Sequence, residues 1–284
     1  MVADVWLGGR VRYRLCRGNS SEGVRRPRLR SDDEARDSAV KEASTQAARR
    51  LKEISDEYGA ESIAVLGSSA STNEELFLLE RLARQVIGTP HIDHQLATFD
   101  GISAAEHQLG IAEIEECDTL VVLGPEPEEQ APVLTLRLYK AERKHNARVI
   151  RLSSDVSGID AAAAAKGAIR IGLIADETNR ENAAAVAGKL AAVGSVRRLT
   201  ITRGMNGRGA KDLGILPNVG PAYAPAAKVG KNGRQILEAL AKGELRGLLI
   251  LGPNPALEAA GDLLERAVKA AACVVAIDTR PGVV

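Results

Sequence analysis

The chain has 284 residues, of which 45% are hydrophobic, so it is long enough for one large or two ordinary α/β domains. Its 38 basic and 37 acidic side chains leave a formal charge of +1, and aromatic residues make up 2%. This composition provides neither a net field that would attract nucleic acid nor an aromatic platform for stacking bases. No apolar run approaches the roughly 20 residues that span a bilayer, and no signal peptide is recognisable. We therefore expect a cytoplasmic protein without a membrane span.

The three cysteines, Cys16, Cys117 and Cys273, lie far apart and show no C-x-x-C spacing. Cysteines this far apart predict neither a zinc site nor a locally assembled iron–sulfur site. Cys273 lies in an apolar run and is expected to be a buried strand residue.

Residues 1–38 differ from the rest of the chain, because arginines crowd them while apolar residues are sparse and aperiodic. This composition predicts little structure in isolation. Two interpretations stay open: an arm that docks on an acidic partner, or a frayed leader.

A helix is predicted from about Ser38, where apolar residues recur near a 3.6-residue period, and Tyr58-Gly59 ends it. The run Ile63 to Leu66 is typical of a strand buried on both faces of a parallel sheet. It ends at once in Gly67-Ser68-Ser69.

A second helix follows this turn, with Ser71 or Thr72 as its N-cap and Gly88 at its end. Strand, tight turn and capped helix make up half of a Rossmann-like unit. In open α/β sheets, ligands bind at that turn.

His91, Asp93 and His94 come next, and two histidines with a carboxylate can bind a transition metal. One short loop without a ligand from another element favours a structural role. We expect Asp93 and His94 to form hydrogen bonds with neighbouring loop backbone.

Strand and helix patterns alternate through the remainder, as is typical of parallel α/β sheets. Strands are predicted at residues 119–123, 147–152, 168–175, 196–201, 245–251 and 273–277. Helices are predicted at residues 132–141, 177–193, 236–240 and 257–271.

Glycine, proline and asparagine cluster over residues 203–234, too densely for a regular element. The apolar anchors Ile215, Leu216 and Tyr223 predict an ordered loop. Basic residues within it could contact phosphates, although the G-x-x-x-x-G-K-[ST] motif of a P-loop is absent.

The chain repeats one pattern three times: a buried strand, the dipeptide Leu-Gly and then a tight turn. The glycines of this pattern are Gly67, Gly124 and Gly252. These turns predict a nucleotide-type cleft, unless each simply ends a buried strand, since none is a full G-x-G-x-x-G. The cleft hypothesis assigns cofactor binding to Gly67, Ser68, Ser69, Asn73, Gly124, Glu126, Gly252 and Asn254.

The order of these motifs resembles the molybdopterin oxidoreductase family. Within it, the chain is similar to the branch of the G subunit of bacterial NADH-quinone oxidoreductase, the large iron–sulfur subunit of complex I. Asn-Gly-Arg-Gly followed by Leu-Pro-Asn-x-Gly-Pro favours this branch over formate dehydrogenase. The resemblance rests on Ser62 to Asp93, Cys117 to Val149, Asn206 to Tyr223 and Leu245 to Thr279.

The resemblance implies an α/β fold of two Rossmann-like three-layer domains with mainly parallel sheets, the second inserted into the first. We expect an Arg-rich arm at 1–38 and a discontinuous first domain at 39–112 plus 243–284. The inserted domain is expected at 113–242 and carries the long loop 203–234.

Catalytic members hold a molybdenum pterin cofactor between the domains and supply a cysteine, selenocysteine or serine as metal ligand. Here residues 95–116 contain no cysteine and only Ser103, which does not match the ligand motif. The segments that bind 4Fe-4S and 2Fe-2S clusters have no counterpart, and Gly8 stands where a cluster cysteine is expected. We therefore expect no cofactor, no catalytic residue and no metal ligand in this chain, and we expect it to be a fragment.

The leading hypothesis is a structural module of the NADH-quinone oxidoreductase G subunit without its own redox centre. Its partners would be other subunits of that complex, through which it would lie at the periphery of the inner membrane. The alternative is an oxidoreductase domain that depends on molybdopterin guanine dinucleotide, similar to formate dehydrogenase. A third hypothesis is a freestanding nucleotide-binding module.

Overall fold

The chain forms two compact units, of which unit 1 comprises residues 1–100 and 204–284 and unit 2 comprises residues 101–203. Unit 2 is thus an insertion into unit 1, the arrangement that the family resemblance implied. None of the helices in the described ranges is long and apolar enough to cross a membrane. The computed structural model describes residues 4–7, 12–15, 28–31, 34–96, 104–106, 108–124, 127, 131–252 and 260–278.

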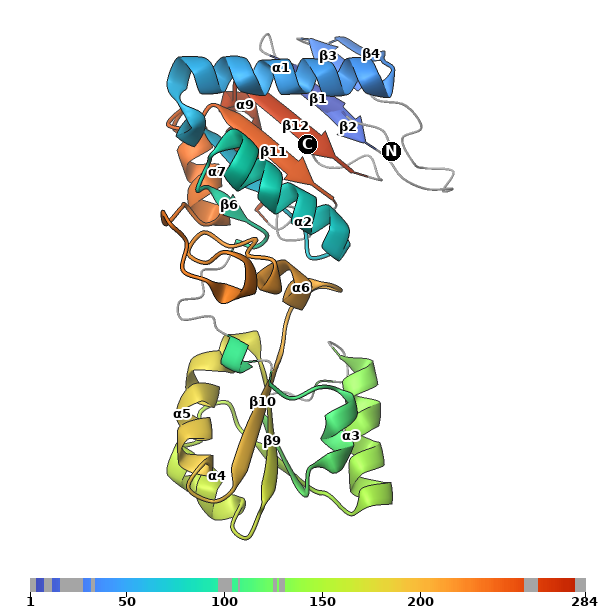
Figure 1. The fold of residues 1–284 in the computed structure, drawn as a ribbon, viewed down its shortest axis with the longest axis vertical. Coiled ribbons are helices and arrows are strands. Elements are labelled where there is room, and N and C mark those ends of the chain that lie inside the picture. Colours follow the sequence, from blue (N-terminus) through green and yellow to red (C-terminus); the bar gives the residue numbers. More distant parts are fainter. Residues whose placement is uncertain are drawn as a thin grey trace. The chain divides into compact units, whose positions relative to one another are not determined.

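Unit 1 contains a six-stranded sheet (Figure 1). Its strands are β1 (Asp4–Leu7), β2 (Arg12–Leu15), β5 (Ile63–Leu66), β6 (Ile92–Asp93), β11 (Gly247–Leu251) and β12 (Cys273–Ile277). Their order across the sheet is β2-β1-β12-β11-β5-β6. The four strands from β12 to β6 run parallel, whereas β1 is antiparallel to both β12 and β2.

Helices cover both faces of this sheet, because successive buried side chains of each central strand point to opposite sides. Ile63 and Val65 of β5 pack in one cluster, and Ala64 and Leu66 pack in the other. The first cluster includes α1 (Val40–Tyr58), α2 (Asn73–Arg81) and α6 (Gly207–Asp212); the second includes α7 (Gly233–Ala241) and α9 (Asp262–Ala270). Shorter helical segments of unit 1 are η1 (Ala60–Ser62), the π-helical η2 (Leu82–Ile87) and η6 (Pro221–Tyr223).

Residues 1–38 were expected to have little structure in isolation; within the whole chain, parts of this segment form strands. Strands β1 and β2 extend the unit 1 sheet, and β3 (Arg28–Ser31) pairs antiparallel with β4 (Glu34–Asp37). The partner of β1 is β12, near the other end of the chain. A local composition argument does not detect pairing at such a sequence separation.

Residues 204–242 were assigned to the inserted domain, whereas the structure groups them with unit 1. Ile236 and Leu240 of α7 are fully buried in a unit 1 cluster, and Ala210 of α6 is fully buried in the other. The predicted loop 203–234 also contains α6, so part of it is helical.

Unit 2 contains a parallel four-stranded sheet made of β7 (Thr119–Leu123), β8 (Arg148–Leu152), β9 (Arg170–Asp176) and β10 (Ser195–Ile201). Its core has two clusters, one with α3 (Pro132–His145) and the other with α4 (Gly158–Ala164) and α5 (Arg180–Leu190). Figure 1 shows α3 on one side of this sheet and α4 with α5 on the other. Short 3-10 segments are η3 (Ala104–Glu106), η4 (Ala112–Glu116) and η5 (Glu177–Asn179).

The two units share one strand order. In unit 2 the order is β10-β9-β7-β8, and the parallel part of unit 1 reads β12-β11-β5-β6. In each case the first strand along the chain lies between the second and the third. The chain therefore reverses direction across the sheet beside β5 and beside β7, and such switch points are where open α/β sheets bind ligands.

Candidate functional site

The switch point of unit 1 lies where β5 and β11 end. Gly67 follows β5 and Gly252 follows β11, and the two strands are neighbours in the sheet. Gly252 has a φ of +76°, and a Cβ atom on it would lie 2.8 Å from Oγ of Ser71 and 3.2 Å from Cβ of Ser68. The structure therefore brings Gly67, Ser68 and Gly252 together at the carboxyl edge of the unit 1 sheet.

The turn after β5 is tied to the segment that follows unit 2. The carbonyl oxygen of Ser69 accepts a 2.6 Å hydrogen bond from the backbone N–H of Asn206. The side-chain amide of Asn206 donates to the carbonyl oxygen of Ser71 and to Oδ1 of Asn73, each at 2.9 Å. Ser69 and Asn73 thus also belong to this edge.

Sequence reasoning did not assign Gly204, Asn206 or Gly209 to the site. A Cβ atom on Gly204 would lie 1.9 Å from Oγ of Ser69, and one on Gly209 would lie 2.3 Å from Oδ1 of Asn73. The Asn-Gly-Arg-Gly motif was noted in the sequence. Its role in fastening the β5 turn, however, depends on a contact between distant segments.

The N-terminus of α2 is closed by its own side chains. The hydroxyl of Thr72 accepts from the backbone N–H of Glu75 at 3.3 Å, and the Glu75 carboxylate accepts from the backbone N–H of Thr72 at 2.9 Å. This capping box shows that Thr72, one of the two predicted candidates, is the N-cap. It also places a carboxylate, rather than a cation, beside the first turn.

Asp93 supports the same edge from β6. Its carboxylate accepts backbone N–H groups of His94, Gln95 and Gly233 at 2.7, 3.2 and 2.9 Å. Burial raises the pKa of Asp93 to about 7, although these N–H groups and the charge of Lys211 act in the opposite direction. Lys211 itself is 1% exposed.

The two histidines near Asp93 also have backbone partners. Nδ1 of His94 lies 2.7 Å from the carbonyl oxygen of Ile215, and Nδ1 of His91 accepts the backbone N–H of Lys231 at 3.0 Å. Burial lowers the pKa of His91. The prediction that Asp93 and His94 form hydrogen bonds with loop backbone is confirmed. No group of three or more His, Cys, Asp or Glu side chains is placed to hold a metal ion in the described parts of the chain.

Unit 2 has a corresponding switch point after β7. Gly124 has a φ of +97°, and a Cβ atom on it would lie 2.7 Å from Nδ2 of Asn179. Asn179 follows β9 and is held by the Asp176 carboxylate, which accepts from Nδ2 and from the backbone N–H of Asn179 at 3.0 Å each. Gly124 thus lies at the switch point of its own unit. Of the other predicted site residues, Glu126 and Asn254 lie outside the described residues.

The two described thiols lie at the amino ends of their strands. Cys117 precedes β7 by two residues, and Cys273 is the first residue of β12. Burial raises the pKa of both thiols, that of Cys273 to about 12. Both side chains are therefore protonated and lie away from the carboxyl ends of the strands. The prediction that Cys273 is a buried strand residue is confirmed.

The carboxyl edge of the unit 1 sheet thus presents hydroxyl, amide and backbone groups. These neutral donors and acceptors suit sugar hydroxyls and phosphates. They do not by themselves provide a nucleophile or a proton-transfer pair.

Comparison with known proteins identifies relatives of part of this chain. A protein provisionally named oxidoreductase YjgC, from Bacillus subtilis strain 168, is 30% identical over 141 residues. A provisionally named formate dehydrogenase, YrhE, from the same strain is 31% identical over 141 residues, and one from Staphylococcus haemolyticus, SH0748, is 29% identical over 134 residues. These matches cover 46%, 46% and 44% of the chain and 14% of each relative.

The family comparison extends over more of the chain. Residues 24–176, more than half of the sequence, match the family described as molybdopterin oxidoreductase. This range includes the turn after β5, the Asp93 region and most of unit 2 as far as the end of β9. The chain therefore belongs to the molybdopterin oxidoreductase family.

Proposed function

We propose that this chain is a structural module of a larger oxidoreductase and carries no redox centre of its own. The observation that carries the proposal is the position of the thiols. Cys117 and Cys273 are buried and protonated at the amino ends of strands, whereas the family's cofactor would be expected at the carboxyl ends.

A molybdenum pterin cofactor is the group that family membership implies. The hydroxyl and amide groups around Ser69 and Asn73 are neutral donors and acceptors, which suit the sugar and phosphates of its nucleotide part. Among the described residues, however, that edge offers no thiolate for the metal, and Asn206 and Thr72 already use their side chains in internal hydrogen bonds. The described donors therefore do not fit the metal centre.

We further propose that the parent assembly is an NADH-quinone oxidoreductase of the complex I type, with the chain derived from its G subunit. The order of the Asn-Gly-Arg-Gly and Leu-Pro-Asn-x-Gly-Pro motifs supports this assignment. The partners would be other subunits of that complex, and the module would lie on the cytoplasmic side at the membrane periphery.

Metal analysis and co-purification test this proposal together. After a high-salt wash that removes other proteins, the tagged chain produced in its native host should contain neither molybdenum nor stoichiometric iron and acid-labile sulfide. In a parallel purification in mild detergent without this wash, NADH-quinone oxidoreductase subunits should co-purify with it. Stoichiometric iron–sulfur content or molybdenum in the purified chain would overturn the proposed role.

The second candidate is a domain that depends on molybdopterin guanine dinucleotide and resembles formate dehydrogenase. The names of YrhE and the staphylococcal relative favour it, although the match covers a small part of each. Fluorescence of oxidised pterin released from the purified chain would support this candidate. Release of no pterin, together with co-purification of complex I subunits, would leave the structural role.

A further inference from the structure

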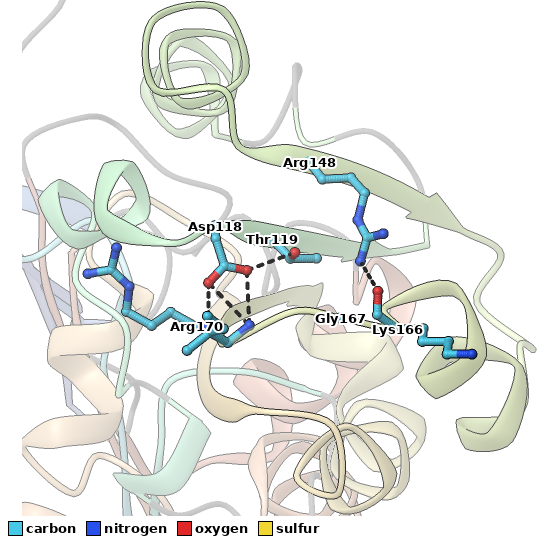
Figure 2. Close-up of a pocket in the computed structure, with 7 residues that line it drawn as sticks. Asp118, Thr119, Arg148, Lys166, Gly167 and Arg170 are labelled. Carbon is cyan, nitrogen blue, oxygen red and sulfur yellow. Dashed lines mark hydrogen bonds between the residues drawn. The ribbon is translucent and has the colours of Figure 1, made fainter.

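A hollow of roughly 420 Å³ opens on unit 2 at the amino ends of β7, β8 and β9 (Figure 2). The first residue of each strand lines it: Thr119, Arg148 and Arg170. Lys166 and Ile169, from the turn between α4 and β9, complete the rim together with Asp118. The hollow lies at the opposite ends of the strands from Gly124 and Asn179, so it is separate from the switch point.

Asp118 is used to hold this turn together. Its carboxylate accepts the backbone N–H groups of Ile169 and Arg170 at 3.2 and 2.5 Å and the hydroxyl of Thr119 at 3.0 Å. Burial raises the pKa of Asp118, but the N–H groups of Arg170 and Ile169 and the Thr119 hydroxyl outweigh it and leave the pKa lowered. Figure 2 shows these bonds clustered around the carboxylate, on the side of the β9 turn.

The three cations of the hollow form no salt bridge in the described part of the chain, although the charge of Arg170 helps to lower the pKa of the nearby Asp118. Within the described residues, no carboxylate forms a salt bridge with Arg148, Lys166 or Arg170, and all three residues are exposed. Nη2 of Arg148 donates only to the carbonyl oxygen of Lys166, at 3.2 Å. The lining therefore has three cations against one carboxylate, which accepts hydrogen bonds from backbone N–H groups.

Helix dipoles account for only one of these charges. Lys166 follows α4 and suits the negative carbonyl end of that helix. Arg148 and Arg170 begin β-strands, where no such dipole acts on them. Their charges remain available to a partner.

The positions of the three charged groups distinguish a small anion from an extended acidic chain as the partner. In Figure 2, the guanidinium of Arg170 and the ammonium of Lys166 point to opposite sides, with the guanidinium of Arg148 between them. A single phosphate is bound best by donors that converge on it. Spread cations fit several carboxylates along an extended chain, and Ile169, whose side chain is 73% exposed, offers an apolar contact among them.

We propose that this amino edge of the unit 2 sheet is a docking surface for an extended acidic segment of a partner protein. Carboxylates of the segment pair with Arg148, Lys166 and Arg170, and an apolar side chain of the segment covers Ile169. The proposal rests on the geometry of unit 2 and not on the function proposed above.

Binding of an acidic probe to the full chain tests this surface. The probe is a fluorescein-labelled peptide that repeats Glu-Glu-Leu, and its anisotropy is followed at low ionic strength. Each of Arg148→Gln, Lys166→Gln and Arg170→Gln should weaken binding roughly two- to fivefold, and the triple variant roughly tenfold or more. Ile169→Ser, and a probe with serine in place of leucine, should also bind more weakly.

The matched control removes three exposed cations elsewhere: Lys52→Gln, Lys189→Gln and Lys269→Gln. This variant has the same net charge as the triple variant and should keep the affinity of the unmodified chain. If both triple variants lost the same affinity for the peptide, net charge alone would explain the loss, and the proposal would be overturned. Saturable pyrophosphate binding that is tighter than peptide binding and lost only in the first triple variant would also overturn it, because the hollow would then be a small-anion site.

Discussion

Gly204 occupies a position that a side chain does not fit. Its φ is +80°, and a Cβ atom would lie 1.9 Å from Oγ and 2.5 Å from Cβ of Ser69. We expect Gly204→Ala to destabilise the chain by about 2 kcal/mol, because backbone strain adds to the clash with the β5 turn. The free energy of unfolding in urea measures the effect.

Gly188 provides the control for this substitution. It lies in α5, with no atom within 4 Å of an added Cβ, so Gly188→Ala should stabilise the chain by about 0.5–1 kcal/mol. If Gly204→Ala were as stable as the unmodified chain, the contact between residue 204 and the β5 turn would not exist in solution.

Asp93 should make stability depend on pH in a predictable direction. Burial raises its pKa from 3.8 to about 7, so the folded chain holds the proton more tightly than the unfolded chain does. Its stabilising contribution is therefore complete below pH 3.8 and is lost as the pH rises through 7. Within this window we expect the free energy of unfolding to fall by about 1 kcal/mol per pH unit on account of this group.

Asp93→Asn should flatten that part of the pH profile, since an amide does not titrate. Urea unfolding of both proteins at several pH values across the window measures the difference in slope. Asp56→Asn changes an exposed carboxylate on α1 and should leave the slope unchanged. An Asp93→Asn variant with the slope of the unmodified chain would show that Asp93 titrates normally in the fold.

At the scale of single elements, the start of α2 depends on one reciprocal pair of hydrogen bonds. Thr72→Ala removes the acceptor for the Glu75 N–H group and should cost about 1 kcal/mol, whereas Thr72→Ser keeps the hydroxyl and should cost much less. Urea unfolding gives the total effect, and amide hydrogen exchange at Glu75 locates it. If amide exchange at Glu75 were unchanged in Thr72→Ala, the hydrogen bonds between Thr72 and Glu75 would not stabilise the helix N-terminus.

Several elements could be predicted because their signals are local. Uncharged runs bounded by polar residues or glycine identified β7 at residues 119–123 and β12 at 273–277 with the observed bounds. The capping residues Ser71 and Thr72 placed the start of α2 to within one residue. Each of these features depends on neighbours within a few residues, which is what a pattern in one sequence contains.

The features that were missed depend on distant partners. Strand β1 pairs with β12 across nearly the whole chain, and its arginine-rich surroundings gave no strand signal. The segment 204–242 was placed in the wrong domain, because its contacts with Ser69, Ser71 and Asn73, which show that it joins unit 1, link residues far apart in the sequence. In the same way, the turns at Gly67 and Gly252 were recognisable from the sequence, but the fastening of the first by Asn206 was not.

At the scale of the whole molecule, the repeated strand order suggests that each unit is complete in itself. All four strands of the unit 2 sheet and the helices on both of its faces come from residues 101–203. Its two hydrophobic clusters draw every member from the same range. About one hundred residues with helices on both faces of a sheet are enough for a domain to fold alone.

We therefore expect the excised segment 101–203 to fold cooperatively, with circular dichroism and dispersed amide resonances typical of an α/β domain. A segment that ends at residue 176 is the matched control. It lacks α5 and β10, so the hydrophobic cluster on one face of the sheet loses Ala183, Val186 and Leu190 and its other members become exposed. This segment should therefore remain unfolded. If segment 101–203 were unfolded as well, the stability of unit 2 would have to come from residues outside it, and the two units could not be treated as separate domains.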